Sequence, residues 1–238
     1  RDVKVYDHYA VIVSEADLGL QIFDLHRLEN KRGRAADGSY EPDALVSTFG
    51  SAHNVVVNEE TARAYVVGGG RGAGPAKGAD RLCNGGLYGV DVVDPLEPKI
   101  LGCLYDEAYV HDAQCVVYRG PDADHFGKEI CFAFTGESSY GQPVVRVLDV
   151  TDAANVEVVS FVVYPEEAFS HQGWLSCDHA TLFVDDELDE QFAWDDEGSR
   201  TKTIVLDVSD LDLPFYSFTH AADMNVIDHN QYVNGAYL

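Results

Sequence analysis

Four histidines have the side-chain type and the surroundings that metal-binding chemistry needs. They are His53, His111, His171 and His229, and each stands just before or at the start of a β-rich run. Their separations of 58, 60 and 58 residues are too regular for nine histidines scattered at random. Imidazole nitrogens bind zinc, copper or iron well, and carboxylates can complete such a site or orient its imidazoles. The regular spacing also indicates a structural repeat, so the elements that carry the histidines come first.

Each repeat contains four short strand patterns and no convincing helix. In the first repeat, residues 3–14 predict two strands around a turn at 7–8, followed by strands at 19–25 and 45–49. The second repeat predicts strands at 53–57, 64–67, 86–92 and 99–104, and the third and fourth repeats begin at His111 and His171. A partial fifth begins at His229, with a strand at 230–233 and a tight turn at Asn234-Gly235.

A second series, of aspartates, keeps step with the histidines. Asp24, Asp91, Asp149 and Asp207 each come near the end of a predicted third strand, and the last three are spaced by 58 residues. An aspartate at this place can accept hydrogen bonds from the amides of the following turn. We therefore expect these aspartates to be structural.

The repeats predict an all-β fold. A four-stranded sheet cannot bury both faces alone, whereas several sheets stacked radially bury them against one another. We therefore predict a β-propeller with about four complete four-stranded blades and the start of a further one, part of a larger propeller. The units span 1–50, 53–108, 111–168, 171–226 and, in part, 229–238, within a single domain. The alternative, a pair of β-sandwich domains, is disfavoured because both residue series keep phase along the whole chain.

Several motifs resemble a known family. The pattern Gly-Leu-x-x-x-Asp-Val-x-Asp-Pro at 86–95 is similar to the LVIVD repeat. The stretches 111–118, 127–132, 171–175, 185–190 and 228–232 resemble the choice-of-anchor B family, and together they span essentially the full chain. This resemblance implies a secreted or surface-anchored β-propeller, usually longer than this chain. It carries no activity and no catalytic residue.

Charge and hydropathy exclude several classes of partner. Lys and Arg number 16 against 41 Asp and Glu, for a formal charge of −25, which repels nucleic-acid phosphates and anionic lipid headgroups. Cations, basic proteins or a glycan suit this surface better. No run approaches the roughly 18 apolar residues of a transmembrane helix. Because the only methionine is Met224, we expect the chain to be a processed or incomplete segment of a longer protein.

The cysteines predict two disulfides. Cys115 and Cys131 are equidistant from Ala123 in a turn-like segment, so they can face each other across a hairpin. Cys83 and Cys103 flank another strand-turn-strand unit, and Cys177 is left without an assigned partner. If both pairs form, the compartment is oxidising, which means extracellular or at the cell surface. The alternative is buried free thiols that only pack.

The blade order predicts where a metal site would lie. The first strand of a propeller blade is innermost, so the four histidines would ring one mouth of the channel, and the loops between second and third strands lie on the same face. The predicted transition-metal residues (zinc, copper or iron) are His53, His111, His171, His229, Asp112, Asp228, Glu15, Glu137 and Glu187. The candidate calcium residues are Asp185, Asp186, Asp189 and Glu190, although the spacing of an EF-hand loop is absent. Alternatively, each histidine bonds the backbone of a neighbouring blade and closes the channel.

Other chemistries have little support. The glycine run at 68–75 is followed by neither a helix pattern nor Gly-Lys-Ser/Thr, so we expect a flexible surface loop rather than a phosphate loop. No Gly-x-Ser-x-Gly elbow is present, and we assign no catalytic residue. The leading hypothesis is a secreted or cell-surface interaction module that binds a protein or glycan partner without catalysis. The rival is a metal-dependent enzyme, redox or hydrolytic, that uses the histidine ring.

Overall fold

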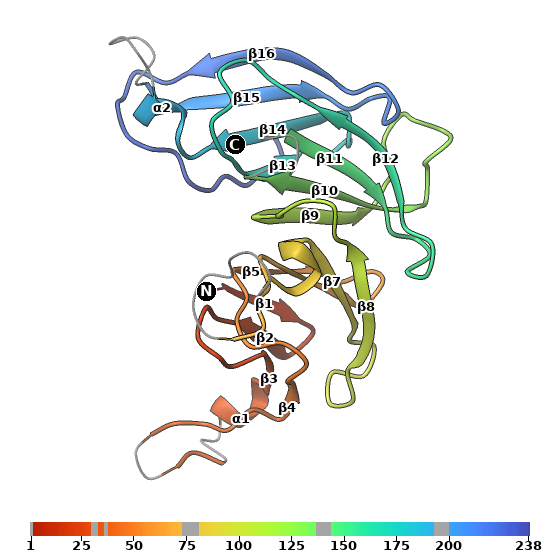
Figure 1. Ribbon diagram of the computed structural model, residues 1–238, viewed down its shortest axis with the longest axis vertical. Helices are drawn as coiled ribbons and strands as arrows, with labels where there is room; N and C mark the ends of the chain where they lie inside the picture. The colour runs from red at the N-terminus through yellow and green to blue at the C-terminus, as the bar shows by residue number, and fades with distance from the viewer. Residues whose placement is uncertain (1, 30–32, 36–37, 73–80, 137–143, 193–199) are drawn as a thin grey trace. The chain divides into compact units, whose positions relative to one another are not determined.

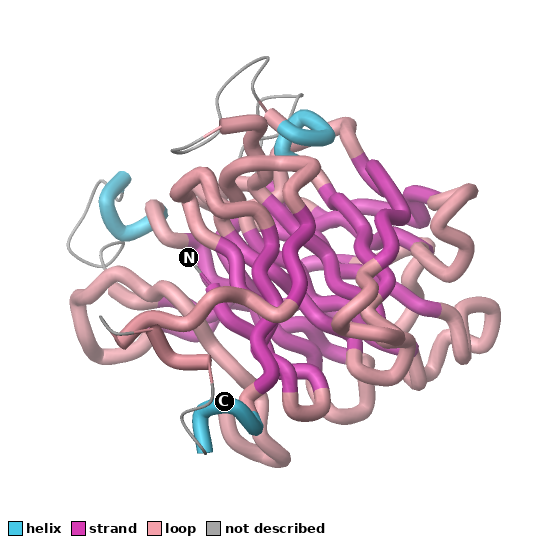
Figure 2. The backbone as a smooth tube through the Cα atoms, turned by 90° about the horizontal axis from the view of Figure 1, so that it is seen from below, coloured by secondary structure: helices cyan, strands magenta, loops and turns pink. Residues whose placement is uncertain are grey.

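The chain forms antiparallel sheets in a computed structural model that describes residues 2–29, 33–35, 38–72, 81–136, 144–192 and 200–238. Sixteen strands of these residues form four sheets of four, each in simple chain order (Figure 1). Strand dominates the backbone, and the three described helices, α1 (His26–Glu29), η2 (Leu82–Gly85) and α2 (Asp189–Phe192), are single turns (Figure 2). None of these helices could cross a membrane. The predicted all-β fold and the four-strand unit are confirmed.

The strands match the predicted repeat closely. The first sheet contains β1 (Asp2–Tyr6), β2 (Tyr9–Val13), β3 (Leu20–Asp24) and β4 (Ala44–Val46), and the second contains β5 (Asn54–Asn58), β6 (Arg63–Val67), β7 (Leu87–Asp91) and β8 (Lys99–Tyr105). The third contains β9 (Asp112–Val117), β10 (Glu129–Thr135), β11 (Val144–Asp149) and β12 (Glu157–Val162), and the fourth β13 (Ser170–Leu175), β14 (Thr181–Asp186), β15 (Lys202–Asp207) and β16 (Phe215–Ala221).

Two compact units, residues 1–107 and 108–238, each contain two sheets and one apolar core. The core of the first unit includes Val11, Ile22 and Val66, and that of the second includes Phe132 and Leu182, all fully buried. Within each unit the first strands of the two sheets are neighbours, β1 with β5 and β9 with β13. The fourth strands β8, β12 and β16 are mostly exposed or half-buried. This is the packing of adjacent propeller blades. That the chain is a single domain stays a prediction.

The aspartate series is structural, as predicted. In every blade the Oδ1 atom of the third-strand aspartate accepts a hydrogen bond from the amide two residues later. The four bonds run from His26 to Asp24, Val93 to Asp91, Thr151 to Asp149 and Ser209 to Asp207, at 2.9, 2.9, 3.0 and 2.9 Å. For Asp149, burial acts to raise the pKa, but hydrogen bonds from Thr151 and Lys128 outweigh it and lower the pKa. The carboxylate therefore starts the same turn in each blade.

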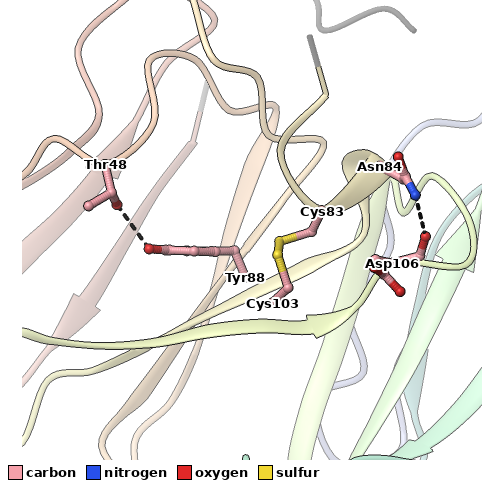
Figure 3. The surroundings of a disulfide bond; sticks show 6 residues. All are labelled: Thr48, Cys83, Asn84, Tyr88, Cys103 and Asp106. Atoms are coloured by element: carbon pink, nitrogen blue, oxygen red, sulfur yellow. Dashed lines mark hydrogen bonds between the residues drawn. A yellow bond between two sulfur atoms is a disulfide. The ribbon is translucent and has the colours of Figure 1, made fainter. Parts of the chain in front are cut away.

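Both predicted disulfides are present. Cys115 and Cys131 lie directly opposite in the β9–β10 ladder, with Cα atoms 4.0 Å apart. Cys83 of η2 joins Cys103 of β8 across 5.5 Å between Cα atoms (Figure 3). In the same view Asn84 donates to the carbonyl of Asp106 at 2.9 Å, so η2 is fixed to the end of β8 by two links. Cys177 is exposed and has no disulfide.

Removing the Cys115–Cys131 bond is expected to destabilise the second unit. The bond closes a loop of 16 residues, and a loop of that length contributes about 3 kcal/mol by restricting the unfolded chain. Replacing both cysteines by alanine should therefore lower the free energy of unfolding by about 2–4 kcal/mol in urea denaturation. Cys177→Ala is the matched control and should change it little. An unchanged midpoint in the double variant would contradict this prediction.

The glycine run differs from expectation. Residues 68–70 are buried and hydrogen-bonded, since Gly70 pairs with Ser51 and Arg81 in isolated bridges and Gly69 accepts from the amide of Leu82. A Cβ on Gly69 would lie 3.1 Å from the Leu82 side chain, so the missing side chain permits this close approach. The expectation of a flexible surface loop is therefore wrong for 68–70, and residues 73–75 lie outside the described part.

The start of a fifth blade is only partly confirmed. The predicted turn is present, with the amide of Asn234 donating to the carbonyl of Tyr237 at 2.8 Å and a positive φ at Gly235. Residues 230–233 do not form a strand, so that prediction is wrong. The side chain of Gln172 replaces a ladder partner for Gln231, because it accepts from the Gln231 amide and donates to its carbonyl, both at 3.0 Å.

Candidate metal centre

Three of the four repeated histidines stack on one another in the second unit. His111 precedes β9, His171 lies in β13, and His229 lies in the C-terminal segment. The ring centroids are 4.1 Å apart for His111 and His171, and 4.4 Å apart for His171 and His229. A register shift between Ser170 and Gln172 takes His171 out of the regular ladder. His111 and His171 are buried and His229 is exposed, so this histidine column runs from the interior to the surface.

Glu187 completes a group of ligand atoms with the two buried imidazoles. One ligand atom each from His111, His171 and Glu187 lies within 4.8 Å of the others. His111 Nδ1 is 3.1 Å from the carbonyl oxygen of His171. A carbonyl only accepts, so Nδ1 carries the proton and the lone pair of the neutral His111 ring is on Nε2. His171 Nε2 lies 3.8 Å from Glu187 Oε2. A ring oriented by a carbonyl at one nitrogen is typical of metal-binding histidines.

The other predicted transition-metal residues have separate environments. His53 and Glu15, in the first unit, pair with each other at 2.9 Å between Nδ1 and Oε1. Asp112 accepts a hydrogen bond from the amide of Ala113 at 2.7 Å, as Asn54 does in the second blade from the amide of Val55. Glu137 lies outside the described residues. The complete four-histidine ring therefore stays a prediction.

Four further carboxylates gather in the second unit. Oxygen atoms of Asp189, Glu190 and Asp228 lie within 4.8 Å of one another, and the carboxyl group of Asp185 is within hydrogen-bond range of Asp228. We call these four residues the carboxylate cluster. Asp185, Asp189 and Glu190 are only 3%, 6% and 8% exposed. The nearby cation is Lys202 of β15, whose Nζ is 3.3 Å from Asp189 Oδ2 and 2.9 Å from Glu166 Oε2.

The carboxylate cluster has strongly raised pKa values. Burial raises the pKa of Asp185 to about 7, with a further contribution from the charge of Asp189. Burial and then Glu190 raise the pKa of Asp189 to about 8. Burial and then Asp185 raise the pKa of Asp228 to about 9. Without a cation, the four groups therefore cannot all be ionised at neutral pH.

Asp186, predicted as a calcium ligand, has a different role. It is fully buried, and its two oxygens accept hydrogen bonds from the Tyr164 hydroxyl at 2.8 Å and from the amides of Ala168, Phe169 and Leu188 at 2.9, 2.7 and 3.3 Å. These bonds hold the segment that carries Phe169, whose ring packs edge-on against His111 at 5.2 Å. We therefore leave Asp186 out of any cation site and treat it as a positioning residue, a role that nothing in the acidic run distinguishes.

Two other groups were not predicted from the sequence. His8, Asp24 and His26 approach one another in the first unit, and Asp122, His125 and Asp212 do so in the second. Their carboxylates already serve turns: Asp24 accepts from the His26 amide, and Asp122 accepts from the amides of Asp124 and Leu211. Both groups are partly exposed, and we assign them no ligand.

Known structures share this fold. No protein-family model matches the chain, and no curated protein matches it. A crystal structure of a candidate 6-phosphogluconolactonase from Bacteroides fragilis matches with 10% identity and a TM-score of 0.58, over 94% of this chain and 55% of that one. A protein from Lactobacillus plantarum matches with 12% identity and a TM-score of 0.55, over 92% of this chain and 55% of that one. The chain is a β-propeller that spans a little over half the length of these structures. The resemblance to the choice-of-anchor B family stays a prediction.

Proposed function

We propose that this propeller binds one divalent transition-metal ion through His111, His171 and Glu187, as part of a secreted or cell-surface protein. The observation that carries the proposal is the convergence of these three ligand atoms within 4.8 Å, on an imidazole whose tautomer is set by the His171 carbonyl. Two imidazoles and one carboxylate are a ligand set that zinc, copper and iron accept.

The site is open on one side. Three protein ligands leave a fourth position for a tetrahedral ion, and the exposed His229 ring stacks on His171 beside it. This position can take His229, water or a group from a partner. A metal ion that accepts a partner's ligand suits an interaction module, since it attracts a protein or glycan that the acidic surface alone would not select.

An oxidising compartment is supported by the chain's own covalent structure. Two disulfides close within the described residues, and such bonds persist mainly outside the cytosol. The choice-of-anchor B motifs at 111–118 and 171–175 agree with a cell-surface location. The activity and partners of the whole protein are part of this proposal, because its structural neighbours are about twice as long.

A hydrolytic role is the second candidate, and the same open position favours it. A metal-bound water between His171 and the exposed side can become a nucleophile at neutral pH. The fold shared with a candidate 6-phosphogluconolactonase makes lactones the first substrates to test. Zinc-loaded protein should then hydrolyse gluconolactone faster than the same protein treated with chelator. Equal rates would leave the binding role alone.

Metal titration tests the proposed site. Chelator-treated protein titrated with zinc in a calorimeter should bind one ion per chain. His111→Ala and Glu187→Gln should each weaken binding by about 100-fold, since even changes behind a metal ligand cost roughly 10–100-fold. His220→Ala, at an exposed histidine of β16, is the matched control. Circular dichroism confirms that each variant is folded. Equal affinities in the His111 and His220 variants would refute the site.

A further inference from the structure

The carboxylate cluster presents more acceptors than its surroundings provide donors for. Its residues come from three elements: Asp185 from β14, Asp189 and Glu190 from α2, and Asp228 from the C-terminal segment. Six of their oxygens are buried and accept from no donor among the described residues. They are Asp185 Oδ2, Asp189 Oδ1, both oxygens of Glu190 and both of Asp228.

Asp185 is an independent observation beside the three carboxylates that converge. It comes from a different strand and is 3% exposed, and its carboxyl is directed at Asp228. Two carboxyl groups can hydrogen-bond only when a proton is shared between them. Otherwise a buried pair of this kind needs a cation, because an unpaired buried charge is costly.

Lys202 cannot satisfy the cluster alone. Its ammonium is one positive charge against four carboxylates, and it is shared with the exposed Glu166. Lys202 approaches Asp189 Oδ2, whereas the oxygens of Glu190 and Asp228 have no such partner in the described part of the chain. The charge imbalance therefore lies on the side of the cluster away from the lysine contact.

We propose that Asp185, Asp189, Glu190 and Asp228 form a calcium site whose ligands are separate from those of the histidine column. Calcium takes six to eight oxygens at 2.3–2.6 Å in a flexible geometry, and four carboxylates can supply them with one or two oxygens each. Magnesium demands a small octahedron and retains its water, which a buried group of four carboxylates does not favour. The all-oxygen set also differs from the nitrogen-containing set of His111, His171 and Glu187.

Titration of chelator-treated full chain with calcium chloride tests this site. We expect one calcium ion per chain, a higher midpoint of thermal unfolding, and roughly tenfold weaker binding of magnesium. Asp228→Asn and Glu190→Gln should each weaken calcium binding by roughly tenfold or more, because fewer charged ligands remain. Asp223→Asn, at an exposed aspartate, is the control and should bind calcium as the unmodified chain does.

Two further variants keep the outcome decisive. Lys202→Met removes the competing cation and should tighten calcium binding several-fold, a gain that misfolding cannot produce. His111→Ala should lose zinc and keep calcium, so failure of the histidine site and failure of this one are distinguishable. Absence of calcium binding at millimolar concentration, or loss of calcium in His111→Ala, would overturn the proposal.

Discussion

Asp186→Asn is expected to lower the free energy of unfolding of the second unit by about 3–5 kcal/mol. The Asp186 carboxylate is fully buried and accepts four hydrogen bonds, from Tyr164, Ala168, Phe169 and Leu188. An asparagine places an NH₂ group where one oxygen stood, so at least one buried donor then faces another donor. Buried donors left unsatisfied cost roughly 1–3 kcal/mol each, and bonds to a charged acceptor are the stronger kind.

Urea denaturation followed by tryptophan fluorescence measures this effect, because Trp174 lies in β13 of the same unit. Asp223→Asn removes a charge at an exposed position and should change stability little. The Asp186 variant should also bind zinc more weakly where it is still folded, since Phe169 would no longer be held against His111. Equal stability of the two variants would show that these four bonds contribute little.

The second large effect concerns pH. In the metal-free protein, stability should fall as pH rises from about 5 to 9, with a drop of roughly 5 °C or more in the midpoint of thermal unfolding. The groups responsible are Asp185, Asp189 and Asp228, whose pKa values are raised to about 7, 8 and 9 by burial and by one another, with Glu190 and Lys202 as charged neighbours.

The direction follows from proton linkage. In the unfolded chain these carboxyls lose their protons near their ordinary pKa of 3.8, whereas in the folded chain they hold them up to pH 7–9. The folded state therefore binds more protons across this window, and raising the pH favours the unfolded chain. The stabilising contribution is complete below pH 4 and is lost as pH rises through the folded pKa values.

Thermal unfolding in chelator at several pH values measures the slope. Asp228→Asn should flatten it, whereas Asp223→Asn should not, which separates the cluster from the general repulsion of a chain with a charge of −25. Saturating calcium should flatten it too, since the cation replaces the protons. The same slope in both variants would contradict the assignment to the cluster.

The sequence by itself determined the blades. Strand alternation, the repeated histidines and the aspartates Asp24, Asp91, Asp149 and Asp207 are local signals, and each acts within a few residues of its own turn. The Cys115–Cys131 pair was equally readable, because a symmetric hairpin brings equidistant residues opposite one another. Where a segment's partner is a side chain rather than a strand, as for Gln231 beside Gln172, the local pattern predicted a strand that does not form.

Only the tertiary structure decided how the polar residues divide. Asp185, Asp186 and Glu187 are consecutive, yet the first joins the carboxylate cluster, the second holds a backbone segment, and the third approaches His171. Successive side chains of a strand point to opposite faces, and what each face meets is set by segments far away in the chain. Those segments, around His111 and Asp228, lie more than forty residues from the run. Spacing along the chain therefore located the acidic run, and packing assigned each carboxylate its chemistry.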